Sequence, residues 1–273
     1  MMGKLKTEGR LAVISGASGG IGGALAGYFI GDGCRVIGIG RNEEKLKALQ
    51  EKLGDGFSYR VFDVSSRAAW ERLRDELLSS GEAVDFLVNN AGVLPSFDRF
   101  REGSGVETCE ETVRVNYLSA AYAISAMMPL LRRSDAPAVL NVASAAALCS
   151  MAGSGAYSAS KAALRAFTET LAAEERKWLS VTLACPGFTK TGIFRGQKNA
   201  SENKWIARIS ADLEKTSRKI YKAFLRKRLT VSPGVDTALL RLLRFFTGSR
   251  APRVIHSFLA MVDDPLFRDV FAE

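Results

Sequence analysis

The sequence has few of the residues on which many metal and hydrolytic sites depend. Among its 273 residues there is one histidine, His256, and there is no Cys-x-x-Cys pair. A histidine-rich metal site and a Ser-His-Asp triad are therefore disfavoured, and we predict no metal. The cysteines lie far apart, as expected for buried, reduced thiols in a cytoplasmic protein. They are Cys34, Cys109, Cys149 and Cys185.

Long apolar runs that could span a membrane are also lacking. Three stretches carry no charged residue, namely 11–31, 115–131 and 136–160. The first contains seven glycines, the second contains Asn116 and Pro129, and the third is rich in serine, glycine and alanine. Such compositions are poor for membrane helices. We therefore predict interior segments of a soluble fold and no transmembrane segment.

Positive charge is concentrated in one late region. The formal net charge is +9, but residues 190–253 hold 16 basic and 4 acidic residues, a net +12. The remainder of the chain therefore carries −3. A nucleic-acid-binding protein would show a more even basic surface, so we predict no nucleic-acid partner.

Short apolar, β-branched runs alternate with longer segments of helical periodicity. Helical spacing of apolar residues marks 42–53 and 66–78, and the alternation predicts right-handed βαβ units in a parallel sheet. Nearly continuous apolar strands favour a sheet covered on both faces. We predict one α/β domain over 1–273, with 189–229 as a helical lid insertion. The expected strands are 11–15, 35–39, 59–62, 84–88, 138–143 and 181–184.

A glycine-rich turn follows the first expected strand. The sequence from Ser15 to Gly22 is SGASGGIG, with the spacing GxxxGxG. Glycine lets the backbone turn sharply and lets a pyrophosphate approach it, while the next helix offers free N–H groups and a positive dipole end. A structural tight turn is the alternative. The candidate dinucleotide contacts in this turn are Gly16, Ser18, Gly20, Ile21 and Gly22.

The end of the second expected strand bears on the choice of cofactor. An NAD site has a carboxylate there for the ribose 2′-hydroxyl. Here Arg41 and Asn42 follow Gly40, and the first acid is Glu43. Arg41 could pair with a 2′-phosphate through bidentate, charge-assisted hydrogen bonds, or it could be a solvated residue at a helix start. We predict NADP(H) as the cofactor.

Further motifs add to the glycine-rich turn. NNAG occupies 89–92, Ser144 lies thirteen residues before Tyr157, Tyr157 and Lys161 form a Tyr-x-x-x-Lys pair, and PGFTKT occupies 186–191. In this order and spacing, over about residues 9–195, the sequence resembles the short-chain dehydrogenase/reductase superfamily. The resemblance implies a Rossmann-type fold and an NADP(H)-dependent carbonyl reductase or alcohol dehydrogenase.

Four residues are candidates for catalysis. Tyr157 and Lys161 share one helix face, and a nearby ammonium would lower the pKa of the tyrosine. The phenol could then exchange a proton with a carbonyl or alcohol oxygen, which the Ser144 hydroxyl could hold. Asn116 interrupts an apolar run, and its buried amide must find partners. The resemblance implies that Asn116 orders a proton-relaying water and that Lys161 also binds the nicotinamide ribose.

The resemblance implies further cofactor contacts. Asp63 and Val64 would touch adenine, although a simple turn aspartate is the alternative. A hydroxyl near the carboxamide would come from Thr189 or Thr191, and Asn89 could merely tie neighbouring strands. The remaining candidate contacts are Asn90, Ala91, Gly92, Pro186 and Gly187.

A basic apolar segment, 216–228, leaves several functions open. The simplest interpretation is a lid over the substrate pocket, with its apolar face packed inward and its charges facing water. A membrane-surface role and the capture of an anionic substrate are the alternatives. Trp205, Ile206 and Ile209 suggest an apolar pocket wall. We expect a small, apolar carbonyl compound or secondary alcohol as the substrate, and a homodimer or homotetramer. A sugar-nucleotide epimerase or dehydratase, or a non-catalytic cofactor-sensing regulator, are the competing functions.

Overall fold

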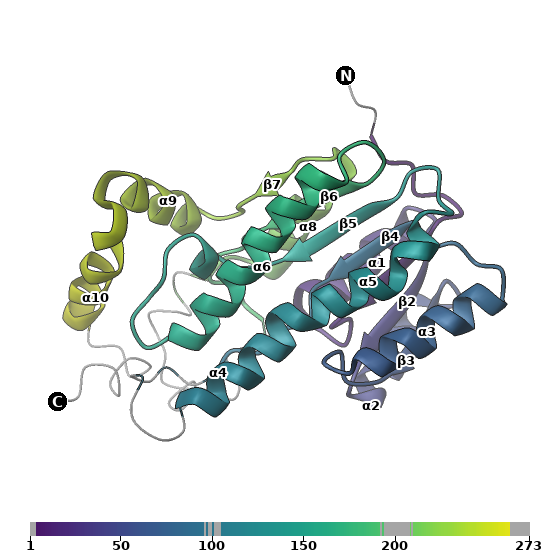
Figure 1. The fold of residues 1–273 in the computed structure, drawn as a ribbon, viewed down its shortest axis with the longest axis horizontal. Coiled ribbons are helices and arrows are strands. Elements are labelled where there is room, and N and C mark those ends of the chain that lie inside the picture. The colour runs from purple at the N-terminus through teal and green to yellow at the C-terminus, as the bar shows by residue number, and fades with distance from the viewer. Residues whose placement is uncertain are drawn as a thin grey trace.

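The computed structural model describes residues 4–95, 97, 100, 105–191, 193, 208 and 210–262. Its centre is a seven-stranded sheet of order β3-β2-β1-β4-β5-β6-β7, in which all neighbouring strands are parallel (Figure 1). The six expected strands are all present, and the short β7 adds a seventh. The strands are β1 (Leu11–Ser15), β2 (Arg35–Gly40), β3 (Phe57–Val61), β4 (Phe86–Asn89), β5 (Ala138–Val142), β6 (Ser180–Ala184) and β7 (Thr230–Val231).

Helices cover both faces of the sheet, and β1 shows why. Ala12 and Ile14 join the apolar core on one face, while Leu11 and Val13 join the core on the other. Successive strand side chains point to opposite faces, so an all-apolar strand needs cover on both. The doubly wound α/β fold is therefore confirmed. One face carries α1 (Gly20–Gly31), α2 (Glu43–Leu53) and α8 (Leu213–Leu225); the other carries α3 (Arg67–Ser79), α5 (Ser119–Leu131) and α6 (Gly155–Glu174).

Other helices lie at the edges of this arrangement. α4 (Gly105–Val113) runs through a π-helical turn, η1 (Arg114–Leu118), into α5. Beyond β7, α9 (Val235–Thr247) and α10 (Ala251–Val262) form a bent pair that projects from the body (Figure 1, yellow). Over the described ranges, no helix is both long and apolar enough to cross a bilayer.

The structure shows where one part of the expected lid, the helix α8, lies, while residues 194–207 of that lid lie outside the described residues. α8 holds most of the basic segment, yet Ile220, Tyr221 and Phe224 are buried in the core on the α1 face. The ring of Phe224 lies 5.6 Å from that of Phe86. α8 therefore covers the sheet and not a pocket, because its apolar stripe finds a larger apolar surface there. Trp205, Ile206 and Ile209 lie outside the described residues.

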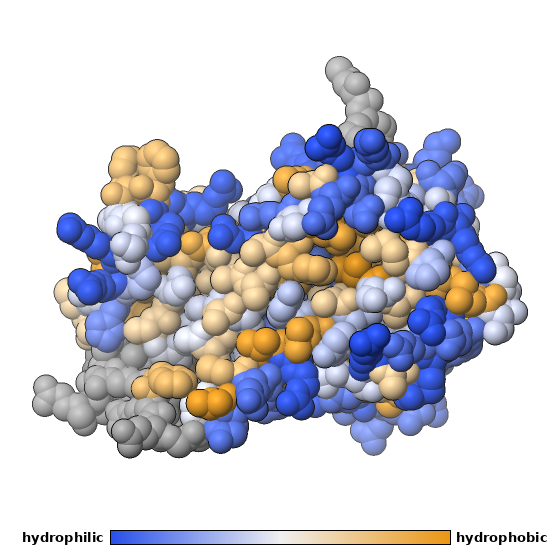
Figure 2. All heavy atoms as spheres, in the orientation of Figure 1, coloured by the Kyte–Doolittle hydropathy of each residue, from blue (hydrophilic) through white to orange (hydrophobic). Residues whose placement is uncertain are grey.

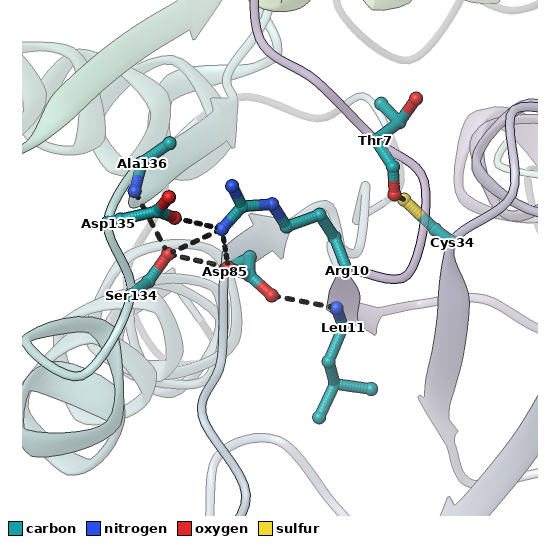
Figure 3. Close-up of polar contacts among 8 residues, drawn as sticks. All are labelled: Thr7, Arg10, Leu11, Cys34, Asp85, Ser134, Asp135 and Ala136. Carbon is teal, nitrogen blue, oxygen red and sulfur yellow. Dashed lines mark hydrogen bonds and ion pairs between the residues drawn. The ribbon is translucent and has the colours of Figure 1, made fainter.

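A polar network lies at the amino-terminal ends of the central strands β1 and β4 (Figure 3). Asp85 Oδ2 accepts from the Leu11 N–H at 2.9 Å. Its Oδ1 accepts from Arg10 Nη1 at 2.6 Å and from Ser134 Oγ at 2.5 Å. The guanidinium of Arg10 also pairs with Asp135. One buried carboxylate thus joins the starts of two strands to the loop before β5.

Side-chain amides bridge β4, β5 and α6 inside the sheet. Asn89 Nδ2 donates to Asn141 Oδ1 at 2.8 Å, and Asn141 Nδ2 donates to Thr168 Oγ1 at 2.9 Å. All three side chains are buried. The structure thus places Asn89 where it ties neighbouring strands together.

Candidate active site

A cavity of about 700 Å³ opens at the carboxyl ends of the parallel strands. Its walls come from the β1–α1 turn, the ends of β2, β4, β5 and β6, and parts of α6 and α9. This is where ligands bind in open α/β sheets, because the strand order reverses between β1 and β4 and leaves a crevice. Most of the predicted site residues line it: Gly16, Ser18, Gly20, Ile21, Arg41, Asn90, Ala91, Gly92, Ser144, Tyr157, Lys161, Pro186, Gly187 and Thr189.

The glycine-rich turn admits no side chain at its critical positions. Gly16 and Gly20 have φ of +68° and +57°. A Cβ on Gly16 would lie 2.8 Å from the Ala91 Cα, and a Cβ on Gly22 would lie 2.3 Å from the Gly16 carbonyl oxygen. Gly22 does not line the cavity, so its requirement is close packing within the turn. Gly19 provides no capping side chain, which leaves the first N–H groups of α1 without that acceptor.

Ser15 and Asn90 clasp the turn to the end of β4. Ser15 Oγ accepts from the backbone N–H groups of Asn90 and Ala91, at 3.1 and 3.2 Å. Asn90 Nδ2 donates in return to the carbonyl oxygens of Ser15 and Gly16, each at 3.2 Å. The hydroxyl at position 15 thus holds the two loops that form the floor of the cavity.

The end of β2 is cationic. Arg41 and Lys45 both line the cavity, and no carboxylate is among its described lining residues. The Arg41 side chain is 69% exposed, and its Nη1 lies 3.9 Å from Asp63 Oδ2. Lys45 is absent from the sequence prediction, although its place on the first turn of α2, four residues after Arg41, could have indicated it.

Asp63 and Val64 are not brought into the cavity. Val64 is buried in the core, where its carbonyl oxygen accepts from the Trp70 indole at 2.9 Å. Burial would raise the pKa of Asp63, but hydrogen bonds from Ser65 and the charge of Arg41 lower it overall. Asp63 thus serves the turn after β3 and the ion pair with Arg41.

Tyr157 and Lys161 project from α6 to the end of β5, and both are buried. Burial raises the pKa of Tyr157, and a hydrogen bond with the Ser144 side chain offsets only part of this. Lys161 Nζ lies 5.9 Å from the tyrosine ring centroid and donates to the Val142 carbonyl oxygen at 3.1 Å. The expectation that the ammonium lowers the tyrosine pKa is therefore wrong for this structure, because loss of water around the phenolate dominates.

Lys161 and Asn116 meet at Gly92. A Cβ on Gly92 would lie 3.1 Å from Lys161 Nζ and 3.2 Å from Asn116 Oδ1. Burial lowers the pKa of Lys161 to about 8. Asn116 Oδ1 accepts from the Val93 N–H at 2.7 Å, and its Nδ2 donates to the Val93 carbonyl at 2.9 Å and to Ser160 at 3.0 Å. As expected for a buried amide, the Asn116 side chain has hydrogen-bond partners, and it is not among the residues that line the cavity.

The Pro186–Thr191 loop is held from a distant helix. Asp236, on α9, accepts from the Phe188 N–H at 2.9 Å, and a Cβ on Gly187 would lie 1.7 Å from the same carboxylate. Thr189 Oγ1 donates to the Gly187 carbonyl at 3.0 Å. Thr191 also lines the cavity, so the choice between the two threonines stays open. Asp236 could not be found from the sequence, since 48 residues separate it from its partner.

The other end of the cavity is apolar. Its wall continues into a core cluster that includes Ala251, Ile255 and Leu259 of α10. No sequence pattern indicates this wall, because its members come from separate loops and from α9 and α10, which the sequence did not predict. The lining residues of this end are Leu94, Phe97, Met151, Phe188 and Leu240.

The cavity fits a nicotinamide dinucleotide. Two glycines without room for a Cβ, Gly16 and Gly22, an uncapped helix N-terminus and two cations at the end of β2 suit the phosphates of a dinucleotide. Among the described residues, no group of Cys, His, Asp and Glu could hold a metal. The fold and the cavity together define a Rossmann-type, dinucleotide-binding protein.

Comparison with known proteins identifies the family. The short chain dehydrogenase family model matches residues 10–202, and the chain belongs to this family of oxidoreductases. It is 34% identical to a fatty acyl-CoA reductase of Acinetobacter baylyi over 62% of this chain and 59% of the relative. It is 32% identical to an NADP-dependent 3-hydroxy acid dehydrogenase of Salmonella typhi, over 59% of this chain and 64% of the relative.

A solved structure shows the same fold. A short-chain dehydrogenase/reductase of Burkholderia phymatum in complex with NAD superposes with a TM-score of 0.78. It is 26% identical, and the match covers 89% of this chain and 95% of that one.

Proposed function

We propose that this protein is an NADP(H)-dependent reductase or dehydrogenase that interconverts an apolar carbonyl compound and the corresponding alcohol. The observation that carries the proposal is the position of Tyr157, Ser144 and Lys161. They line the same cavity as the glycine-rich cradle and the apolar wall. A substrate oxygen in this cavity would reach the phenol and the hydroxyl together, while the carbon skeleton of the substrate packed against the apolar wall.

The chain's own residues handle the proton. Hydride transfer is the chemistry that a bound nicotinamide supplies. During reduction, Tyr157 would donate its proton to the substrate oxygen, and Ser144 would hold that oxygen in place. The raised pKa of Tyr157 keeps the phenol protonated, as a proton donor requires. Lys161 would bind ribose hydroxyls and return a proton towards Tyr157.

Asn116 would act through its backbone. Its side chain already makes three hydrogen bonds, to Val93 and Ser160, so we place the relaying water at its backbone carbonyl oxygen. Asn116 lies in the π-helical turn η1, and such turns interrupt the regular helical hydrogen-bond pattern. This would leave a carbonyl available beside Lys161.

The preference for NADP(H) rests on Arg41 and Lys45. Both cations face the cavity, and the described residues that line it include no carboxylate; Asp63, 3.9 Å from Arg41, lies outside this lining. One relative is described as NADP-dependent, while the solved neighbour is a complex with NAD. The single-domain organisation, the cytoplasmic location and a homodimer or homotetramer are also part of the proposal.

The proposal is tested by a panel of apolar ketones and secondary alcohols with NADPH and NADP+. We expect turnover, and we expect Tyr157→Phe to lose about 10²–10⁴-fold in kcat. Cofactor affinity should change little, because the ring still packs. Tyr122→Phe, on α5 and outside the cavity lining, is the matched control and should keep full activity.

Either of two results would contradict this mechanism. One is near-normal turnover by Tyr157→Phe. The other is cofactor binding without any turnover across the panel, which would favour a cofactor-sensing regulator.

A further inference from the structure

The α9–α10 pair exposes an unusual amount of apolar surface. Eight of the twelve large apolar side chains exposed in the described part of the chain lie on these two helices. Phe245 and Phe246 are 80% and 73% exposed, and their rings contact each other edge to face. We call these eight residues the outer face: Val235, Leu239, Leu242, Phe245, Phe246, Val254, Phe258 and Met261.

Each of the two helices carries two apolar stripes. On α10, Ala251, Ile255 and Leu259 are buried at a spacing of four residues, whereas Val254 and Phe258 are exposed at the same spacing. On α9, Leu240 and Leu243 pack inward against the cavity wall, while the outer-face residues of that helix point away. The inner stripes account for the packing of the pair. The outer stripes are exposed in the described part of the chain, and an exposed apolar patch of this kind marks an interaction surface.

The outer face is bordered by positive charge. Four exposed arginines lie on the same two helices and their connection, and residues 235–262 contain one acid, Asp236. That acid does not balance the arginines, because its carboxylate is engaged with the Phe188 N–H and abuts Gly187. The arginines are Arg241, Arg244, Arg250 and Arg253.

We propose that the outer face docks on the surface of an anionic lipid bilayer. Exposed phenylalanine and leucine beside arginine is the composition of helices that lie in the membrane interface. Arginine stems can remain along the apolar layer while the guanidinium groups reach lipid phosphates. The pair projects from the body, and apolar side chains gather at its outer corner, where a flat surface could reach them (Figures 1 and 2).

Charge argues against a second copy of the chain as the occupant. A symmetric dimer through this face would bring the same four arginines of both copies together, without acids from either outer face to pair with them. Such a dimer would suffer repulsion between these arginines, whereas anionic lipid headgroups would neutralise them. This inference does not depend on the proposed reaction.

Vesicle flotation with the full chain tests the proposal. We expect binding to vesicles that mix phosphatidylcholine and phosphatidylglycerol, and much weaker binding to phosphatidylcholine alone. Phe245→Ser/Phe246→Ser should lower partitioning onto the mixed vesicles by roughly tenfold or more. Arg241→Glu/Arg253→Glu should do the same and should remove the preference for anionic lipid.

Matched controls separate this face from general stickiness and from misfolding. Arg176→Glu/Lys177→Glu reverses two exposed charges just after α6 and should leave vesicle binding unchanged, as should Val61→Ser on β3. Thermal unfolding of each variant shows that it folds. In Phe246→Trp, brominated lipids should quench the added indole, because its position would enter the interface.

Two outcomes would overturn the proposal. The first is the absence of binding to the mixed vesicles by the folded wild-type chain. The second is a wild-type oligomer in light scattering that Phe245→Ser/Phe246→Ser converts to a monomer, which would make the outer face a contact between copies.

Discussion

At the scale of single residues, burial decides how the ionisable groups of the cavity behave. Tyr157 has its pKa raised and Lys161 has its pKa lowered, because each loses water around its charged form. Arg41 differs, since it is largely exposed at the cavity rim. The first two residues therefore carry a stability cost that depends on pH, while Arg41 is available to an incoming anion.

Lys161 should make the free energy of unfolding depend on pH in a defined direction. Its pKa falls from 10.5 in the unfolded chain to about 8 in the folded protein. Below pH 8 the buried charge destabilises the fold; as pH rises towards 10.5 the unfolded chain holds the extra proton, and this cost is relieved. Relative to Lys161→Met, the wild-type protein should gain on the order of 2 kcal/mol over that interval.

Urea denaturation of both proteins across this pH range makes the measurement. Tyr157 and the buried cysteines have raised pKa values, so they lower the stability of both proteins as pH rises. Subtracting the unfolding free energy of Lys161→Met from that of the wild-type protein removes this opposing effect. Parallel pH profiles would show that Lys161 is not desolvated.

Arg41 should set the cofactor preference. A hydrogen bond to a charged group contributes about 1.5–3 kcal/mol, so kcat/KM should favour NADPH over NADH by roughly ten- to a hundredfold. Arg41→Asp should lose at least that preference, because the carboxylate repels the 2′-phosphate and can accept from a ribose hydroxyl. Lys52→Asp, an exposed charge reversal later on α2 and outside the cavity lining, should keep it. Equal use of both cofactors by the wild-type enzyme would refute the assignment.

At the scale of elements, helices far along the chain complete the site. α9 provides Leu240 to the cavity wall and Asp236 to the loop that follows β6. Gly187 and Gly234 both pack against that carboxylate, since a Cβ at either position would lie 1.7 or 2.2 Å from its oxygens and would displace it. The position of the substrate end therefore depends on how α9 is anchored.

Removing the Asp236 anchor should impair substrate binding more than folding. Asp236→Ala loses an acceptor for a backbone N–H, which should cost about 1.5–3 kcal/mol of stability. The freed Pro186–Phe188 loop should raise KM for the carbonyl substrate severalfold. Asp212→Ala is the matched control, because Asp212 also accepts a backbone N–H, at the start of α8. It should lose about 1 kcal/mol of stability with unchanged KM; equal effects of both variants on KM would remove the positioning role.

At the scale of the whole molecule, the two ends of the parallel strands have different roles. The cavity lies at their carboxyl ends, while the Asp85 network lies at the amino ends of β1 and β4. Asp85 joins β1, β4 and the loop before β5. Its loss should therefore lower the stability of the whole sheet and should hardly change the geometry of the distant cavity.

Asp85→Ala should therefore destabilise the protein without changing its chemistry. It leaves the Leu11 N–H and the Arg10 guanidinium without a buried acceptor, and we expect a loss of about 3 kcal/mol. Asp135→Ala removes the exposed partner of the same arginine and should change stability little. Thermal and urea unfolding give the comparison. A similar loss in both variants would show that exposure does not separate the two ion pairs.

The sequence by itself determined the strands of the sheet, the cradle and the family. These follow from local constraints: apolar runs need burial on both faces, and Gly16 and Gly20 adopt a backbone conformation that other residues rarely accept. The order of motifs then placed Ser144, Tyr157 and Lys161 at one cavity, where the structure brings them together.

Only the tertiary structure decided which surfaces pack together and which side chains are buried. The periodicity of α8 indicates an apolar stripe but not its partner, which proved to be the sheet and not a pocket. The pKa of Tyr157 depends on burial that no spacing reveals, and Asp236 meets Phe188 only after the chain has folded back on itself. The physical reason is that burial and long-range contacts belong to the packed chain, whereas helical and strand preferences belong to its segments.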